Sequence, residues 1–128
     1  MKSELERKAQ EMGIGHAVRF VGKQSGQTLI NWFKVCDTAV VPSRNEPFGI
    51  VVLEAWACAK PVVVTKCGGP GEFVRHEDDG WHVDPEAGSI AWGVSQVFND
   101  WERSKHMGLR GRYDRDNFIF LIMFWLVV

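Results

Sequence analysis

The sequence lacks a surplus of positive charge. Its 128 residues include 15 Lys and Arg against 16 Asp and Glu, which gives a formal net charge of -1. Domains that bind DNA or RNA usually carry a basic patch or stripe that neutralises phosphates. We therefore expect no nucleic-acid partner. With 45% hydrophobic and 24% charged residues, a chain of this length is expected to fold as one ordinary globular domain.

Cysteine is scarce as well. The three cysteines, Cys36, Cys58 and Cys67, are odd in number and lie in apolar or glycine-rich surroundings. Neither they nor the four histidines follow the paired spacing of a metal site. We therefore expect reduced thiols, no bound metal and a cytoplasmic protein.

A secretory signal and a membrane-spanning run are also absent. Residues 2–8 are mostly charged or polar and contain no apolar stretch of the kind found in export signals, so we expect no export. Residues 118–128 are wholly apolar, but this run is much shorter than the roughly 20 residues that a transmembrane helix needs.

The apolar run at 118–128 has three interpretations. It forms a strand or helix docked on the domain, it binds a partner or a membrane surface, or it is an exposed end that promotes aggregation. An interfacial helix usually has a basic polar face, which this run lacks. Membrane contact through the run has little support, and a peripheral membrane location stays an alternative to a purely cytoplasmic one.

What the sequence does contain is an alternation of β-rich and helical patterns. Strands are predicted at residues 17–21, 39–41, 62–64 and 81–83. Helices are predicted at residues 3–12, 25–35, 49–59, from 70 onward, 87–98 and 101–110. Ser3 and Glu6 form a capping-box pattern at the first helix, and Ser25 is a candidate cap of the second.

Short apolar strands that alternate with helices indicate an α/β fold with a doubly wound, Rossmann-like parallel sheet. Such sheets are covered by helices on both faces and bind ligands beyond the carboxyl ends of their strands. Functional side chains are therefore expected in the loops that follow the predicted strands.

The loop after the strand at 39–41 carries the most informative pattern. Glu46 lies in this loop, and Glu54 lies on the helix that follows, with seven residues between them. The backbone N–H groups of Gly49 and Ile50 should lie at the helix N-terminus, which favours an anion such as a diphosphate. A carboxylate on each side suits sugar hydroxyls, although an isolated pair of glutamates at this spacing would be ordinary surface acids.

A second loop, residues 66–72, follows the next predicted strand. Gly68 and Gly69 could face the same crevice as the first loop, or they could form a simple turn. Arg44 could supply positive charge to a diphosphate, although a loop arginine more often forms a solvated or structural ion pair.

Residues 41–83 closely resemble the donor-binding domain of retaining GT-B glycosyltransferases of family 4, which carry an E-x7-E signature. The matching motifs stand in the order and spacing of that family: Pro42-Ser43, Glu46-Pro47-Phe48-Gly49, Glu54-Ala55, Lys60-Pro61-Val62-Val63, Gly68-Gly69 with Glu72, and Gly80. The resemblance covers residues 1 to about 117. It implies the C-terminal half of a GT-B fold, followed by the apolar tail at 118–128.

The resemblance implies roles for the site residues. Glu54 would hydrogen-bond the ribose hydroxyls of the donor, whose vicinal diol suits two carboxylate oxygens. Glu46, as the catalytic residue, would lie near the transferred sugar and stabilise positive charge at its anomeric carbon. Phe48 and Gly49 would shape the turn, and the missing Cβ of Gly49 would let backbone donors approach the diphosphate. No metal or cofactor beyond the nucleotide-sugar donor is implied.

Two departures from the family pattern affect this interpretation. Ala59 stands where the family usually has glycine, so it would strain the turn if that position needs a positive φ. Family members also carry a β-strand, a glycine-rich turn, diphosphate-binding cations and an acceptor-binding domain ahead of the helix at 3–12, and these 128 residues do not include them.

We therefore interpret the chain as the donor-binding domain of a hexosyltransferase, apparently truncated at its N-terminus. It would transfer a hexose from a nucleotide sugar to an acceptor with help from an acceptor-domain chain as partner. The alternatives are a non-catalytic nucleotide-sugar-binding or assembly module and an inactive fragment.

Overall fold

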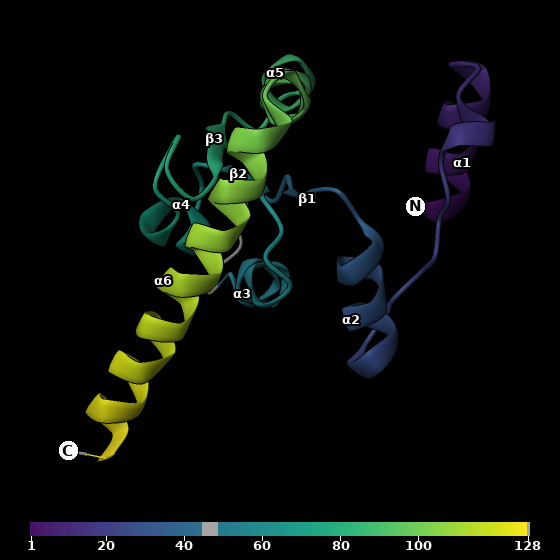
Figure 1. The fold of residues 1–128 in the computed structure, drawn as a ribbon. Helices are drawn as coiled ribbons and strands as arrows, with labels where there is room; N and C mark the ends of the chain where they lie inside the picture. Colours follow the sequence, from purple (N-terminus) through teal and green to yellow (C-terminus); the bar gives the residue numbers. More distant parts are fainter. Residues whose placement is uncertain (45–48, 128) are drawn as a thin grey trace.

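The computed structural model describes residues 1–44 and 49–127, and for residues 118–127 it describes the backbone alone. Its helices and strands alternate along the chain (Figure 1). The helices are α1 (Lys2–Glu11), α2 (Gly26–Val35), α3 (Ile50–Ala57), α4 (Gly69–Phe73), α5 (Ala87–Asn99) and α6 (Trp101–Val127), and a short 3-10 helix, η1, spans Gly15–Ala17. The strands are β1 (Ala39–Val41), β2 (Val62–Thr65) and β3 (Trp81–Val83).

The three strands form a parallel sheet in the order β1-β2-β3. Ala39 aligns with Val62, and Val63 aligns with Trp81. The central strand β2 is buried along its whole length. The predicted α/β fold with a parallel sheet is confirmed, and the predictions of strands at 39–41, 62–64 and 81–83 agree with β1, β2 and β3 to within one residue.

Helices cover both faces of the sheet because successive side chains of β2 point to opposite sides. Val62 and Val64 pack in one cluster with Val52 and Trp56 of α3. Val63 packs in a second cluster, with Val97 of α5 and Met107 of α6. Each cluster is a separate apolar layer, so β2 is the centre of the fold.

Helix α6 lies very close to α3 and to the turn that follows it, because two glycines of α6 form the contact. A Cβ added to Gly108 would lie 2.2 Å from the carbonyl oxygen of Ala59, and one added to Gly111 would lie 2.3 Å from the Trp56 ring. The backbone of α6 continues as one helix to Val127, well beyond the end predicted at residue 110 (Figure 1). Over the described residues, none of the helices is both long and apolar enough to span a membrane.

The N-terminal elements differ from the prediction in two ways. The helix predicted at 3–12 is present as α1, but it begins at Lys2, so Ser3 lies inside the first turn and the capping-box hydrogen bonds are not made. The strand predicted at 17–21 is wrong: Gly15–Ala17 forms η1, and residues 18–21 belong to no strand. These residues have no neighbouring strand among the described ones, and a strand needs a hydrogen-bonding partner to form.

The predicted start of α2 is correct, but the cap hydrogen bond expected from Ser25 is not made. Ser25 is the residue before the helix and has extended backbone angles (φ -152°, ψ 165°), as a cap requires, but its side chain makes no capping hydrogen bond. Phe33, farther along α2, is buried in the same cluster as Val62 and Trp56. α2 is therefore held on the sheet by burial of its apolar face.

Candidate functional site

The loops that follow the three strands meet at one edge of the sheet. The Thr65 hydroxyl, at the end of β2, donates a hydrogen bond to the carbonyl oxygen of Ser43, which follows β1. Lys66 Nζ lies 3.3 Å from the Asp84 carboxylate, which follows β3. As the sequence predicts, the described part of the first loop, residues 42–44, and the second loop share the carboxyl edge of the sheet.

Gly49 joins these two loops. It has a left-handed backbone conformation (φ 66°, ψ 30°) immediately before α3. A Cβ at this position would lie 2.8 Å from the ring of Phe73 and 2.9 Å from Pro70, both of which belong to α4. The missing Cβ of Gly49 thus leaves room for α4, and the approach of its backbone to a diphosphate stays a prediction. The glycine brings the N-terminus of α3 against the second loop.

The second loop also depends on glycine. Gly68 has φ 80° and caps α4, which begins at Gly69. A Cβ on Gly71 would lie 2.3 Å from the carbonyl oxygen of Lys66, so the loop turns back closely on itself. Gly68 is exposed and Gly69 half-buried, which leaves both at the surface of the carboxyl edge.

Glu54 lies on the outer face of α3, away from the sheet, and lines a groove of about 460 Å³. The groove is lined by Ile50, Leu53, Glu54 and Ala57 of α3 and by Cys58 just after it, by Ile30 and Lys34 of α2, and by Arg115 of α6. The Glu54 side chain is half-buried and makes no hydrogen bond or ion pair within the described ranges 1–44 and 49–117. Its carboxylate oxygens are therefore available to a ligand.

Lys34 and Arg115 bring positive charge to the groove, and the sequence analysis missed both. Arg115 pairs with Asp116 at 2.9 Å through Nη1, whereas its Nε is buried and has no hydrogen-bond partner. The two cations come from helices far from Glu54 in the sequence. No local pattern marks them, because only the packing of α2 and α6 against α3 brings them to Glu54.

The other predicted site residues have different outcomes. Glu46 and Phe48 lie outside the described residues, so their predicted roles stay predictions. Arg44 is exposed, and its guanidinium donates a hydrogen bond of 3.5 Å to the carbonyl oxygen of Pro85. This contact holds Arg44 along the carboxyl edge of the sheet, between the loops after β1 and β3.

A second polar cluster ties the loop before β3 to α6. The Asp79 carboxylate, on a residue with 1% exposure, accepts hydrogen bonds from Arg75 N at 2.6 Å and Arg75 Nε at 3.2 Å. Arg75 also pairs with Asp114 of α6 at 2.5 Å. Burial and the hydrogen bond with Asp114 raise the pKa of Asp79 to about 6. The cluster shares no residue with the Glu54 groove and joins the loop before β3 to α6.

The cysteines and histidines form no recognisable reactive centre. All three cysteines are free and half-buried, and burial raises the pKa of the Cys36 thiol, which disfavours the reactive thiolate. Within the described part of the chain, no group of three or more His, Cys, Asp or Glu side chains could hold a metal ion.

Comparison with known proteins connects this arrangement to a family. Residues 1–114 match the sequence model of the family described as glycosyl transferases group 1. The chain belongs to this family. Among relatives of this group 1 glycosyltransferase chain, an uncharacterized glycosyltransferase of Methanocaldococcus jannaschii is 45% identical over 102 residues, which are 79% of this chain and 26% of the relative. A D-inositol 3-phosphate glycosyltransferase of Jonesia denitrificans is 40% identical over 95 residues, which are 73% of this chain and 22% of that enzyme.

Solved structures place the fold in the GT-B class. Sucrose-phosphate synthase from Thermosynechococcus elongatus superposes on 98% of this chain with a TM-score of 0.86 and 30% identity, and this chain covers 33% of it. HepE of Anabaena, solved with UDP and in another crystal with UDP-glucose, superposes on 90% of this chain with a TM-score of 0.84 and 27% identity, with 32% of HepE covered. The predicted GT-B C-terminal domain is confirmed as the fold. The chain spans a third or less of the length of these relatives.

Proposed function

We propose that this chain is the donor-binding domain of a retaining, family 4 glycosyltransferase that transfers a hexose from a nucleotide sugar. The observation that carries the proposal is Glu54. The family resemblance implies that it binds the ribose, and its uncommitted carboxylate lines a groove together with Lys34 and Arg115. Membership of the glycosyl transferases group 1 family and the UDP complexes of HepE support a nucleotide-sugar ligand.

In this proposal the nucleoside diphosphate lies along the axis of helix α3. Val52 N and Leu53 N donate the first intrahelical hydrogen bonds, to Gly49 O at 3.0 and 3.4 Å, so the amides of Ile50 and Val51 lie ahead of them at the helix start. Unpaired amides and the helix dipole favour a diphosphate at this position.

The ribose would then lie one turn farther along the helix. Glu54 follows Ile50 by four residues, which puts both on one face of α3 with a rise of about 6 Å between them. The two carboxylate oxygens of Glu54 can accept hydrogen bonds from the two ribose hydroxyls. Lys34 and Arg115 would offset the repulsion between this carboxylate and the phosphates.

The transferred sugar would lie beyond the diphosphate, at the carboxyl edge of the sheet. Glu46 is the proposed stabiliser of positive charge at the anomeric carbon. No metal ion takes part in this proposal. Transfer also needs an acceptor held against the anomeric carbon, a positioning effect that accounts for about 7 to 11 kcal/mol of barrier lowering. We therefore propose that an acceptor-binding domain supplied outside these residues completes the enzyme.

Calorimetric titration of the purified chain with UDP, GDP and ADP tests this function. We expect one of the three to bind, and Glu54→Gln to weaken it roughly 10- to 100-fold, as expected for hydrogen bonds to a charged group. Glu102→Gln is the matched control, because Glu102 is exposed on α6 and pairs only with the nearby Lys105 among the described residues. A folded chain that binds none of the nucleotides, or that binds equally well as Glu54→Gln, would refute the proposal.

A further inference from the structure

One end of the Glu54 groove is not used by the diphosphate and ribose of the proposed function. Ile50, Glu54 and Cys58 line the groove at intervals of four residues along α3 and the turn that follows it, with a rise of about 6 Å at each step. In a nucleoside diphosphate the ribose lies between the phosphates and the base. With the diphosphate at Ile50 and the ribose at Glu54, the base therefore lies beside Ala57 and Cys58.

The lining of this end suits a flat ring of low polarity. Ala57 and Cys58 are half-buried, and Leu53 and Ile30 add apolar surface from α3 and α2. Sites for small molecules combine such apolar surface with a few polar groups that fix the orientation of the ligand. Lys34, the other lining residue of α2, supplies a polar group of this kind.

Lys34 lies at the same end of the groove as Cys58. It belongs to the last turn of α2 and follows Ile30, which also lines the groove, by four residues. Two residues later, burial raises the pKa of the Cys36 thiol, and the nearby Cys58 thiol raises it to a smaller extent. This interaction brings the end of α2 close to the end of α3. The Lys34 ammonium makes no hydrogen bond or ion pair within residues 1–44 and 49–117, so its donors are available to a ligand.

Arg115 also lines the groove, but its guanidinium is less available than the Lys34 ammonium. Nη1 of Arg115 pairs with Asp116 at 2.9 Å, and Nε is buried, so a ligand in the groove does not reach Nε without a rearrangement. Of these two cations, Lys34 is the one whose side-chain donors are all unpaired among the described residues.

A lysine ammonium distinguishes bases that carry a carbonyl oxygen from bases that carry an amino group. The ammonium has three N–H donors and no acceptor. Uracil and guanine present a carbonyl oxygen where cytosine and adenine present an amino group. Lys34 can therefore donate a hydrogen bond to the first two bases but opposes a donor with a donor in the other two, which leaves both donors unpaired and costs binding free energy.

We propose that Lys34 selects the base of the donor nucleotide and favours uracil or guanine over cytosine or adenine. This inference rests on the proposed function, because the start of α3 and Glu54 determine where the base lies. It goes beyond that function by assigning base specificity to a residue of α2, outside the motif that contains Glu54.

Titration with two matched pairs of nucleotides tests the proposal. Within the pair UDP and CDP, and within the pair GDP and ADP, the bases are similar in size and differ in the carbonyl oxygen and the amino group. In calorimetry on the purified chain, for each pair that binds, UDP or GDP should bind roughly 10- to 100-fold more tightly than CDP or ADP. Lys34→Met removes the charge and keeps a long side chain, and it should bind both members of the pair with similar affinity.

Lys34→Glu is a second test at the same position. It replaces the donors by acceptors and should reverse the preference, so that CDP or ADP binds more tightly than UDP or GDP. The new charge should also weaken all four nucleotides through repulsion with their phosphates, so the ratio of the two affinities within a pair is the quantity compared.

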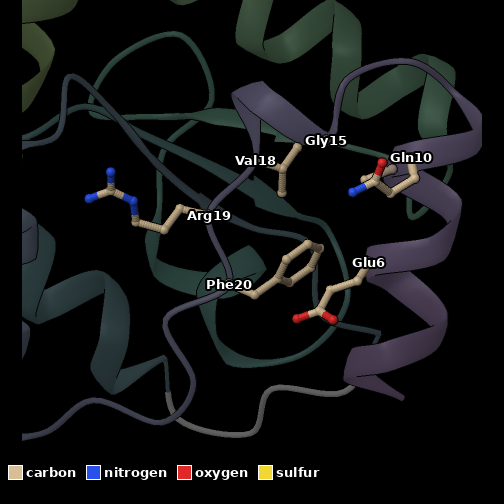
Figure 2. A pocket seen from close by; sticks show the side chains of 7 residues that line it. Glu6, Gln10, Gly15, Val18, Arg19 and Phe20 are labelled. Atoms are coloured by element: carbon tan, nitrogen blue, oxygen red, sulfur yellow. The ribbon is translucent and has the colours of Figure 1, made fainter.

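Arg19→Met is the matched control. Arg19 is an exposed cation that lines a different groove, of about 320 Å³, between α1 and residues 15–20. Figure 2 shows Arg19 at this groove, together with Glu6 and Phe20. Its replacement should change neither the affinities nor their ratio.

Equal affinities within a pair would overturn the proposal. So would a preference that Lys34→Met leaves unchanged, because Lys34 would then only stabilise the end of α2, as a cation in the last turn of a helix does. Equal affinities that are both weakened by Glu54→Gln would overturn base selection and leave the proposed function standing. A folded chain that binds none of the four nucleotides would overturn both.

Discussion

The N-terminal layer, residues 1–37, and the sheet region, residues 38–117, bury very different amounts of their side chains. Within the N-terminal layer only Ala9 and Phe33 are buried, whereas four successive residues of β2 are buried in the sheet region. Both regions contain amphipathic helices and β-rich runs. The difference shows that these patterns produce a core only where a neighbouring element is present to cover them.

Backbone strain is distributed differently in the two regions as well. The positive-φ residues of the N-terminal layer are all glycines, Gly13, Gly22 and Gly26. The described part of the sheet region also holds Ala59 at φ 56° and Glu77 at φ 67°. Residues other than glycine rarely adopt this conformation, and backbone hydrogen bonds hold it here: Ala59 N donates to Trp56 O and Glu77 N donates to Gly80 O, both at 2.8 Å.

The largest expected effect is the loss of the central aromatic ring of the sheet region. Trp56 is 2% exposed, packs edge-on against Phe73 and donates a hydrogen bond to the carbonyl oxygen of Asp79. Trp56→Ala should cost about 3 to 5 kcal/mol of unfolding free energy, measured by urea denaturation. Leu5→Ala in the N-terminal layer, where Leu5 is 46% exposed, should cost less than about 1 kcal/mol. Similar losses of unfolding free energy in the two variants would contradict the difference in burial between the two regions.

Substitutions at two glycines distinguish the stability cost of steric overlap from the cost of backbone strain. Gly49 and Gly22 have nearly the same φ, 66° and 68°, but an added Cβ meets Phe73 at 2.8 Å in the first case and no atom within 4 Å in the second. Gly22→Ala should therefore cost about 1 kcal/mol from strain alone, and Gly49→Ala about 2 to 4 kcal/mol. Equal losses in urea denaturation would mean that α4 moves aside without cost.

The carboxylate of Asp79 should make the sheet region less stable as pH rises. Its pKa is raised to about 6, so the folded state holds a proton that the unfolded state releases near pH 4. This contribution to stability is present below pH 4 and is lost as pH rises through 6, by about 3 kcal/mol. Urea denaturation between pH 4 and 7.5 should show this loss relative to Asp79→Asn. A difference between the two proteins that does not vary with pH would refute the assignment.

The smallest expected effect is a gain in stability at Ala59. Glycine has no steric penalty at φ 56°, so Ala59→Gly should stabilise the fold by about 0.5 to 1 kcal/mol after the entropic cost of glycine. Ala91→Gly, at an exposed position inside α5, is the control and should destabilise by about 1 kcal/mol. Thermal denaturation of both variants gives the comparison, and a loss of stability at both positions would show that Ala59 is not strained.

The sheet region is predictable from sequence because its signals are local. The run at 62–64 is continuous, β-branched and bounded by turn residues, which is enough to place β2. The run at 17–21 has a similar composition, but strand formation depends on a partner that local sequence does not specify. Helix α6 continues beyond its predicted end at residue 110 because the chain after Gly111 contains no glycine or proline to stop it.

The candidate site is predictable to a similar degree. Glu54 was found because it belongs to a motif with fixed spacing, and the structure places it in a groove. Lys34 and Arg115 were not found, since tertiary packing alone brings them to Glu54. Gly49 was correctly placed at the start of α3, and its missing Cβ makes room for Phe73 and Pro70, a packing role that the sequence pattern does not indicate.

The two glycines of α6 also set the rotational phase of that helix. Gly108 and Gly111 must both face α3, because any side chain there would overlap Ala59 or Trp56. If α6 rotated about its axis or shifted by one residue, side chains would replace the glycines at these two contacts. Arg115 lies four residues beyond Gly111, on the same stripe, so the phase that the glycines impose also directs Arg115 into the groove beside Glu54. The charge of the groove is thus encoded partly by two residues that have no side chain.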